Sequence, residues 1–246
     1  MSKFIPNKNV YKDMFNFEKN YWWYVALREN LNFFIKKFKP KTVLDAGCGT
    51  GANMIEIKNY VDKIYGIDIS KEAIEICNEN KLNNLFLGNL VNLPFEDNMF
   101  DLIYCMDVFG NLNDIESDTV LREFYRCLNN SGYLIIQTAA IGGLTSSHDE
   151  YWDIQKRYQL EELGDKISKN KYVIIKKSYR HFLLFPMIAL IKILNKNKKE
   201  LNSGDFFQLP FFINYSLIWI MRIENFLLRF LNFPIGSSAF IIARKN

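Results

Sequence analysis

Residues that build metal centres and disulfide frameworks are scarce in this sequence. Of its 246 residues, two are His and four are Cys. No group of His, Cys and acidic side chains has the spacing of metal ligands, and no two cysteines form a C-x-x-C pair. The cysteines are Cys48, Cys77, Cys105 and Cys127. We expect them to be reduced and buried, and we expect no bound metal.

Long hydrophobic runs and a strong charge of either sign are also missing. No uninterrupted apolar run reaches the length of a membrane-spanning helix, and residues 1–8 contain no apolar signal core. The net charge of +4 is small, and only residues 192–199 are densely basic, which argues against a nucleic-acid partner. We therefore expect a cytoplasmic protein, and peripheral contact with a membrane stays open as an alternative.

A glycine-rich stretch at residues 43–51, V-L-D-A-G-C-G-T-G, is the most informative part of the sequence. An apolar run leads into three glycines at alternate positions, which is typical of a buried parallel strand that ends in a tight turn before a helix. Glycine permits backbone angles that other residues resist, and it lets a ligand approach the main chain. Free N–H groups at the start of the following helix would face such a ligand. The stretch predicts a site for a small polar ligand.

Two interpretations compete for this turn. Gly47, Gly49 and Ala52 fit the dinucleotide fingerprint G-x-G-x-x-G/A, which is a weak signal alone. The other interpretation uses the longer pattern D-x-G-x-G-x-G that begins at Asp45. Both allow a second strand that ends in Asp68, whose carboxylate suits two ribose hydroxyls.

Downstream segments separate the two interpretations. Residues 88–95, G-N-L-V-N-L-P-F, and 100–103, F-D-L-I, follow the turn in order. Together the three segments resemble the successive motifs of the class I S-adenosylmethionine (SAM) dependent methyltransferases, whereas a dinucleotide-binding domain does not explain residues 88–95. Residues 121–134 and the closing F-P-I-G-S-S at 233–238 resemble further segments of this family. The resemblance therefore covers nearly the whole chain.

The resemblance implies a SAM site, with S-adenosylhomocysteine as the product. The glycine turn would receive the methionine amino and carboxylate groups, Asp45 would orient the turn and the amine, and Asp68 would hold the ribose. Asn89 stands where many relatives have Asp beside adenine, and an amide can still donate and accept hydrogen bonds. Leu90 would pack on the adenine ring. The implied cofactor-binding positions in the core are Asp45, Ala46, Gly47, Cys48, Gly49, Gly51, Asp68, Ile69, Asn89, Leu90, Met106 and Asp107.

The end of the fourth predicted strand departs from the family. Met106 and Asp107 lie there, where ligands meet open α/β sheets, and Asp107 is either a cap or a neighbour of the methionyl amine. Many relatives continue with an acid and a histidine, where this chain has Gly110 and Asn111, so a histidine base at that point is absent. His148, in a polar loop after the fifth strand, is the candidate catalytic base, and a solvated loop residue is the alternative.

Residues 11–38 predict an amphipathic helix that carries four adjacent aromatics, Y-W-W-Y at 21–24. Helical neighbours point about 100° apart, so these rings cannot all face one core. The helix either packs flat on the sheet domain or covers the SAM site as a lid. The family resemblance favours the lid, because many relatives carry an N-terminal W-W helix with a nearby arginine. Trp23 and Arg28 are therefore added to the implied cofactor-binding residues.

From Lys41 onward, strands and helices alternate, which predicts an α/β fold with a Rossmann-like, doubly wound sheet of seven strands. The predicted strands lie near 42–46, 63–68, 84–88, 101–106, 132–138, 172–178 and 238–244. The predicted helices between the earlier strands lie near 52–60, 71–80 and 116–129. The expected layout is a helical lid at 1–40, a SAM-binding core at 41–178, a hydrophobic helical insertion at 179–236 and the last core strand at 237–246.

The insertion contains two apolar segments. Residues 182–194 are almost wholly apolar and are preceded by His181, which we expect to make a local hydrogen bond. A second helix is predicted at 211–232, and its polar residues share one narrow stripe: Asn214, Arg222, Asn225, Arg229 and Asn232. The two segments either form a roof over an apolar acceptor pocket or form a monotopic patch that rests on a membrane.

These patterns favour a SAM-dependent methyltransferase that acts on a small, apolar, lipid- or glycan-linked acceptor. Two alternatives remain open: methyl transfer to a macromolecule such as tRNA or protein, and SAM binding without turnover. The Asn/Asp-Pro-Pro-aromatic tetrapeptide that marks amide or amino-base methylation is missing after the fourth strand, which counts against the first alternative.

Overall fold

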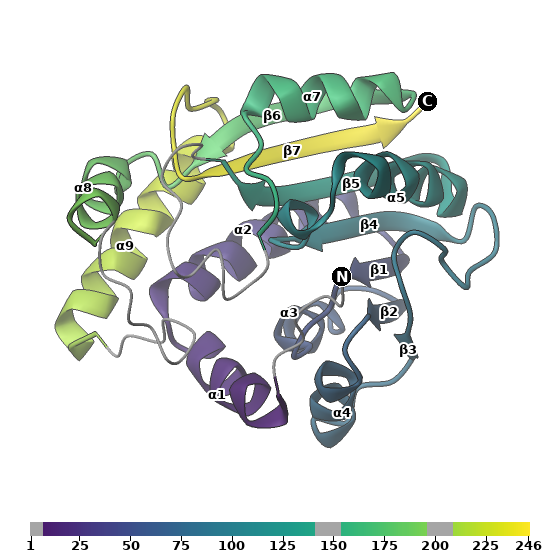
Figure 1. Ribbon diagram of the computed structural model, residues 1–246, viewed down its shortest axis with the longest axis horizontal. Helices are drawn as coiled ribbons and strands as arrows, with labels where there is room; N and C mark the ends of the chain where they lie inside the picture. The colour runs from purple at the N-terminus through teal and green to yellow at the C-terminus, as the bar shows by residue number, and fades with distance from the viewer. Residues whose placement is uncertain (1–6, 141–153, 196–208) are drawn as a thin grey trace.

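A mixed sheet of seven strands forms the centre of the molecule, in the order β3-β2-β1-β4-β5-β7-β6 (Figure 1). The structure is a computed structural model that describes residues 7–140, 154–195 and 209–246. β7 runs antiparallel to both of its neighbours, β5 and β6, and the remaining pairs are parallel. The strands are β1 (Thr42–Ala46), β2 (Lys63–Asp68), β3 (Leu85–Leu87), β4 (Phe100–Met106), β5 (Leu128–Ala139), β6 (Tyr172–Arg180) and β7 (Ser238–Lys245). The predicted α/β fold and its seven strands are confirmed.

Helices cover both faces and the carboxyl edge of this sheet. They are α1 (Lys8–Glu18), α2 (Trp22–Phe38), α3 (Ala52–Ile57), α4 (Lys71–Glu79), the 3-10 turn η1 (Phe109–Asn111), α5 (Asp114–Cys127), α7 (Leu160–Lys169), α8 (Phe185–Asn195) and α9 (Phe211–Leu228). α3, α4 and α5 confirm the three predicted core helices. α7 has no counterpart among the predictions.

Short polar residues fix where the helices begin. The Ser70 hydroxyl accepts the Ala73 N–H at 3.1 Å and so caps α4. Asn113 and Glu116 form a reciprocal capping box at the start of α5, which satisfies two backbone donors that the first helical turn leaves free. Both helices therefore begin directly after the carboxyl edge of the sheet.

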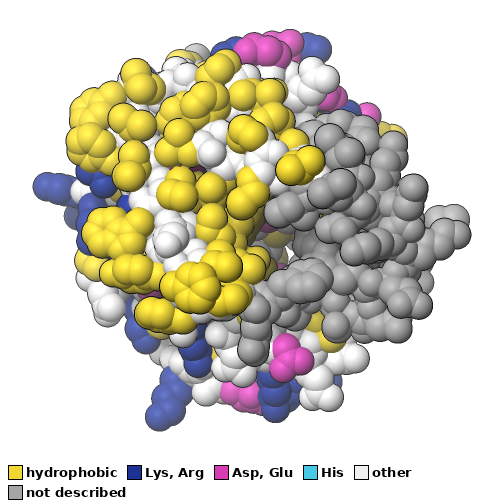
Figure 2. Space-filling view, turned by 90° about the vertical axis from the view of Figure 1, so that its left-hand side faces the viewer, with side chains coloured by type: hydrophobic (Ala, Val, Ile, Leu, Met, Phe, Trp, Pro, Cys, Tyr) yellow, Lys and Arg dark blue, Asp and Glu magenta, His cyan; other side chains and the backbone are white. Residues whose placement is uncertain are grey.

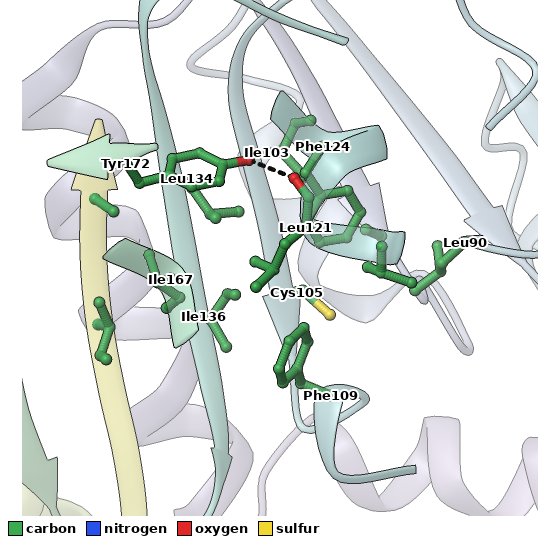
Figure 3. Close-up of a cluster of buried hydrophobic side chains, with 14 of the residues drawn as sticks. Leu90, Ile103, Cys105, Phe109, Leu121, Phe124, Leu134, Ile136, Ile167 and Tyr172 are labelled. Carbon is green, nitrogen blue, oxygen red and sulfur yellow. Dashed lines mark hydrogen bonds between the residues drawn. The ribbon is translucent and has the colours of Figure 1, made fainter. Parts of the chain in front are cut away.

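Two hydrophobic clusters hold the layers together. On one face, the buried side chains of α5 and α7 pack against the strands, and the Tyr172 hydroxyl donates to the Leu121 carbonyl at 3.1 Å (Figure 3). On the other face, α2 and α3 supply Phe34, Ile35 and Met54 against the same strands. α1 packs separately on α4 through Tyr11. All four cysteines are free thiols and buried, as expected.

The single helix predicted for residues 11–38 is wrong. The chain forms two helices, with a break at residues 19–21. Asn214 of α9 holds this break, because its side chain accepts the Trp22 N–H at 2.9 Å and donates to the Asn20 carbonyl at 2.8 Å. The break contains no Gly or Pro, so the local sequence carries no signal for it.

The N-N-S-G segment at residues 129–132 has the composition of a turn, but it lies inside a strand. β5 already begins at Leu128, and the pairing with β4 shifts register between Phe100 and Leu102. The extra residues form a bulge within the strand, with Ser131 at φ 63°. A bulge uses the same glycine and asparagine signals as a turn, so the two are hard to separate in sequence.

A third helical layer lies at the carboxyl edge, on the left of Figure 1. α8 and α9 pack there with the start of α2 in a cluster that contains Trp22, Ala26, Leu184, Ile218 and Met221. The predicted insertion before the last strand is therefore helical. Its second helix ends at Leu228, four residues before the predicted limit at Asn232.

Candidate active site

The glycine turn joins β1 to α3 and leaves room for a ligand at one position. Gly47, Gly49 and Gly51 all have positive φ angles, of 84°, 52° and 77°. A Cβ on Gly47 would lie 2.5 Å from Val108, and one on Gly51 would lie 2.3 Å from Leu82, so these two glycines are required by packing. A Cβ on Gly49 would meet nothing within 4 Å. The turn is therefore tight against the protein at its ends and open at its middle.

Asp68, at the end of β2, supports the open part of the turn. Its carboxylate accepts the Gly49 N–H at 2.8 Å and the Ser70 N–H at 2.9 Å. Burial raises the pKa of this carboxyl, although these backbone hydrogen bonds oppose the rise. Ile69 follows with its side chain exposed, so a polar and an apolar group lie next to each other at the edge where the motifs predict ribose and adenine.

Asp45 lies beneath the turn in a fully enclosed position. The Tyr104 hydroxyl donates to its carboxylate at 2.8 Å. Burial raises the pKa of Asp45 to about 8, because the desolvation of the charged form outweighs the hydrogen bond from Tyr104. A cationic group brought to this position would favour the ionised carboxylate.

Helix α1 brings a second carboxyl group to the turn that the sequence analysis missed. Glu18 accepts a hydrogen bond from the Thr50 hydroxyl, and burial raises the pKa of Glu18 to about 7. Arg28 of α2 lies close enough to lower this pKa in part, and it hydrogen-bonds Glu56 at 2.9 Å and the Lys19 carbonyl at 3.1 Å. The Tyr11 hydroxyl lies beside Ser70 and Asp68.

The N-terminal part of the chain therefore covers the turn mainly through α1. No local pattern in the sequence distinguishes Glu18 from the other acids of that helix. The placement of Arg28 beside Glu18 keeps it near the predicted site, and its role toward a cofactor stays a prediction.

The remaining predicted cofactor residues follow β3 and β4. Asn89 is half-buried, and its side chain accepts the Val91 N–H at 3.2 Å. Leu90 is buried in the hydrophobic cluster between the sheet and α5 (Figure 3), so its contact with adenine stays a prediction. Met106 is partly exposed and Asp107 is exposed, with Asp107 at φ 57°. These residues all lie at the carboxyl edge of the sheet.

A chain of hydrogen bonds runs along this edge from Asp107 to α2 and α9. Gln137 of β5 donates to the Asp107 carboxylate at 3.1 Å and accepts from the guanidinium of Arg180, at the end of β6. Arg180 also donates to the Ala26 carbonyl and to the Asn225 side chain, each at 3.1 Å. Its side chain is fully buried, and burial lowers the pKa of Arg180 to about 10.

His181 occupies the next position along the edge in an unusual environment. It is fully buried with φ 61°, and its Nδ1 lies 2.9 Å from the Ser237 hydroxyl. Its Nε2 has no hydrogen-bond partner. Burial and the nearby Arg180 hold the pKa of His181 well below 6.5, so the ring is neutral at pH 7. The local hydrogen bond expected for this residue is present.

A buried carboxylate holds the strained backbone of His181 in place. Glu224 of α9 accepts the N–H groups of His181 and Leu183, at 2.5 Å and 3.0 Å. Trp23 stacks on the imidazole with ring centroids 3.9 Å apart. The structure thus places Trp23 beside His181, and its predicted role at the cofactor stays a prediction. His148, the predicted base, lies outside the described residues.

Close packing around Gly110 explains why this chain has glycine where many relatives have an acid. The Gly110 carbonyl accepts the N–H groups of Gln155 and Lys156, both at 3.0 Å. A Cβ at this position would lie 3.0 Å from the Lys156 carbonyl oxygen and 3.1 Å from the Thr138 hydroxyl. Residues 155–156 therefore pass so close to η1 that a larger side chain at Gly110 would displace them.

Polar residues inside strands are the signal that the sequence analysis did not use. Gln137 directly follows the apolar run Leu134–Ile136 and Arg180 ends β6, and both belong to the buried chain of hydrogen bonds. Within the described ranges, no group of His, Cys and acidic residues is arranged to hold a metal. A hollow at the opposite, amino-terminal edge of the sheet, lined in part by Phe38 and Tyr133, contains none of the predicted site residues.

Fold and site together define an α/β protein with a nucleotide-type cofactor site at the carboxyl edge of the sheet. Residues 44–136 match the family described as a methyltransferase domain. Among solved structures, a SAM-dependent methyltransferase from Archaeoglobus fulgidus covers 89% of this chain and 93% of its own, with a TM-score of 0.58 and 17% identity. A phosphoethanolamine N-methyltransferase from Haemonchus contortus, solved with S-adenosylhomocysteine, covers 88% of this chain and 52% of its own, with a TM-score of 0.56 and 20% identity.

Residues 44–136 therefore form a methyltransferase domain of the class I SAM-dependent type, whose cofactor is SAM. A demethylmenaquinone methyltransferase from Oceanobacillus iheyensis is 32% identical over 153 residues, which are 58% of this chain and 63% of that protein. An uncharacterised protein from Methanocaldococcus jannaschii is 37% identical over 112 residues, 44% of this chain and 46% of that protein. The chain spans about half the length of the curated relatives it matches.

Proposed function

We propose that this protein transfers a methyl group from SAM to a small acceptor that is apolar or linked to a lipid or glycan. The observation that carries the proposal is the glycine turn, which is closed at both ends and open above Gly49, with the Asp68 carboxylate beside it. The residues present fit SAM, because the turn offers main-chain groups to the methionine end and Asp68 offers an acceptor for ribose hydroxyls.

Bound SAM supplies a sulfonium methyl group as the electrophile. The chain contributes binding and placement, which can account for much of the rate of such a transfer. Asp45 and Glu18 would favour the ammonium group of the cofactor, because both are buried carboxyls that ionise more readily beside a cation. Ile69 and Asn89 would lie against the adenine, on its apolar face and its polar edge.

The acceptor would approach from the side of Asp107, Gln137 and His181. His181 is neutral and fully buried beside Trp23, so it would support this side of the site without bringing a charge to it. The rings of Trp23 and Trp22 line the same corner, which suits an apolar acceptor. Relatives named as demethylmenaquinone methyltransferases support this class of acceptor. His148 remains a candidate base by its sequence alone.

The two alternatives predict different outcomes for the same experiment. We would incubate the protein with methyl-tritiated SAM and with lysate separated into lipid, small aqueous and macromolecular fractions. The proposal predicts label in the lipid or small-molecule fraction, and much less label with Asp68→Ala when SAM is not saturating. Label confined to tRNA or protein would support the first alternative, and SAM binding without label in any fraction would support the second.

A further inference from the structure

Helix α9 is apolar on its outer side, and on its inner side polar residues lie beside the buried apolar residues Leu217, Ile218, Met221 and Leu228. Its polar stripe faces the protein, where Asn214 accepts the Trp22 N–H at 2.9 Å and Arg222 pairs with Glu29 at 2.7 Å. Asn225 donates to the Ala26 carbonyl at 2.9 Å. A helix of a soluble domain places such groups in water and buries its apolar side. In α9 these polar groups are used for docking to α2 instead.

The apolar side of α9 faces outward as a continuous stripe. Its members recur every three or four residues, and each is between 47% and 81% exposed: Phe211, Tyr215, Trp219, Ile223, Phe226 and Phe230. Leu190 of α8 extends the surface at 56% exposure. Figure 2 shows these hydrophobic side chains gathered over one face of the molecule, with Lys and Arg at its margin. We call this surface the α9 face.

By length and composition α9 meets the criterion for a membrane-spanning helix, but its packing excludes that orientation. Only 28% of the helix is buried, whereas a core helix that meets the same criterion is mostly buried. Asn214, Arg222 and Asn225 bind α2 along the whole length of the helix. A helix held lengthwise against its own domain can lie in a membrane surface but cannot cross the bilayer.

Three cations lie near the carboxyl end of the α9 face. Arg229 lies over the Phe33 ring at 4.1 Å, and Lys176 donates to the Leu231 carbonyl at 3.0 Å. Lys37 is close enough to Lys176 to lower its pKa further, in addition to the larger effect of burial. In the described part of the chain, no carboxylate pairs with any of the three. Cations beside an apolar stripe suit anionic lipid headgroups beside acyl chains.

We propose that the α9 face binds the surface of a membrane that contains anionic phospholipids, with Trp219 and Phe226 inserted at the headgroup level. Tyr and Trp in the stripe favour this interface, because each has an apolar ring and a polar tip. A second copy of the chain fits less well. The exposed stripe contains no acid, so it offers no partner for Lys37, Lys176 and Arg229 of a second copy.

The same helix connects the α9 face to the candidate active site. Its outer side carries Trp219 and Phe226, and its inner side carries Glu224, which holds His181, and Asn225, which bonds to Arg180. A bilayer-dissolved acceptor would therefore reach the acceptor side from the surface to which the protein is bound. This link to the acceptor rests on the proposed function, whereas membrane binding does not.

A flotation assay tests the proposal directly. The purified chain would be mixed at low salt with vesicles of equimolar phosphatidylglycerol and phosphatidylcholine, and then with vesicles of phosphatidylcholine alone. We expect it to float with the anionic vesicles, and we expect high salt to weaken binding. Trp219→Ser with Phe226→Ser should lower the bound fraction on the order of tenfold. Lys37→Gln with Lys176→Gln should lower binding to the anionic vesicles while leaving the fold unchanged.

A matched control is available on α5, where Ile115 is 80% exposed outside the α9 face. Ile115→Ser should bind vesicles as the parent does, and circular dichroism should show that all variants are folded. The proposal is overturned if the parent stays in the soluble fraction at low salt, or if Ile115→Ser loses binding to the same extent. A different result would assign the face to a second copy of the chain. In that case the parent does not float with vesicles but is a dimer in solution, and the double variant Trp219→Ser with Phe226→Ser is a monomer. Because binding is measured without SAM, failure here leaves the proposed methyl transfer untouched.

Discussion

The two sides of the carboxyl edge are built by different means. On the cofactor side, a tight turn, two strand ends and main-chain N–H groups make most of the site within residues 45–107, and Glu18 of α1 is the buried carboxyl added from outside that range. On the acceptor side, side chains from β5, β6, α2 and α9 are bound to one another across as many as 199 residues of sequence. One side depends on local backbone geometry, and the other depends on tertiary contacts between distant segments.

Because of this difference, substitutions on the two sides should affect different properties of the protein. The cofactor side is exposed to water in places and loses affinity when a single acceptor is removed. The acceptor side contains a buried cation, a buried carboxylate and a neutral histidine, so it loses stability when one partner is removed. Variants on the cofactor side should therefore change the affinity for the cofactor, and variants on the acceptor side should change the free energy of unfolding.

Removal of the Glu224 carboxylate should have the largest effect. Glu224→Ala leaves the His181 and Leu183 N–H groups unbonded and removes a buried charge near Arg180. We expect the free energy of unfolding to fall by about 3–5 kcal/mol, as for loss of one member of a buried charge pair. Urea unfolding measures this change, with Glu29→Ala, on the exposed pair with Arg222, as the control. Equal stability of Glu224→Ala and the parent would contradict the comparison.

Substitution of Asp68 should act on affinity more than on stability. Asp68→Ala removes the proposed ribose acceptor, and we expect the affinity for SAM to fall by about 2–3 kcal/mol, or roughly 30- to 150-fold. Calorimetry with SAM and with NAD measures the effect. The cofactor assignment fails if the variant binds SAM as tightly as the parent does. Tighter binding of NAD than of SAM to the parent would instead support the dinucleotide interpretation.

The pH dependence of SAM binding tests the two buried carboxyls on the cofactor side. Burial raises the pKa of Glu18 to about 7 and that of Asp45 to about 8, so both hold protons in the free protein at pH 6. A bound ammonium favours the ionised forms, so binding should release protons, and affinity should rise between pH 6 and 8 by up to about tenfold per pH unit for each proton released. Titrations in buffers with different ionisation heats count these protons.

Two further measurements bear on the same carboxyls. Glu18→Gln should reduce the pH dependence, whereas affinity that is independent of pH would remove both carboxyls from the site. Because their folded pKa values are raised, these acids contribute most to the stability of the SAM-free protein below the unfolded pKa of about 4, and this contribution falls as the pH rises through 7 to 8.

Substitution of Trp23 should have the smallest effect. It tests whether this residue belongs to the acceptor side or to the cofactor side. Trp23→Leu removes the stack on His181, worth about 0.5–1.5 kcal/mol of stability. We expect SAM affinity to change less than about twofold, while methyl transfer to the acceptor falls. A marked loss of SAM affinity, or SAM-dependent protection of residues 15–30 from proteolysis that the variant lacks, would place Trp23 in a lid over the cofactor.

Sequence patterns were sufficient for the sheet and for the cofactor motifs because the physical causes are local there. Alternating strands and helices predict a doubly wound sheet, and the positive φ angles at Gly47, Gly49 and Gly51 explain why only glycine suits the turn. Each of the seven strands lies within a few residues of its predicted position, with β5 beginning four residues early. The helix break at residues 19–21 was invisible, since Asn214 imposes it from a distance of almost two hundred residues.

The acceptor side was not predictable for the same reason. Periodicity identified a narrow polar stripe on α9, but it does not say which side of a helix faces the protein. Asn214, Arg222 and Asn225 face inward, contrary to the usual expectation, because they have partners on the segment 20–29. Glu18 and Arg180 likewise acquire their roles only when segments that are remote in sequence meet.

The position of β7 in the sheet constrains the order in which the protein is completed during synthesis. β7 lies between β5 and β6, yet it follows both in the chain, after the two apolar helices α8 and α9. Until β7 has been made, β6 has no strand to pair with and β5 keeps an open edge, so the nascent chain exposes unpaired backbone beside unburied helices. Insertion of β7 between β5 and β6 then completes the sheet and orders His181 through Ser237 in a single late step. Ribosome-bound chains that stop before Ser238 should therefore depend on chaperones or a membrane surface to stay soluble.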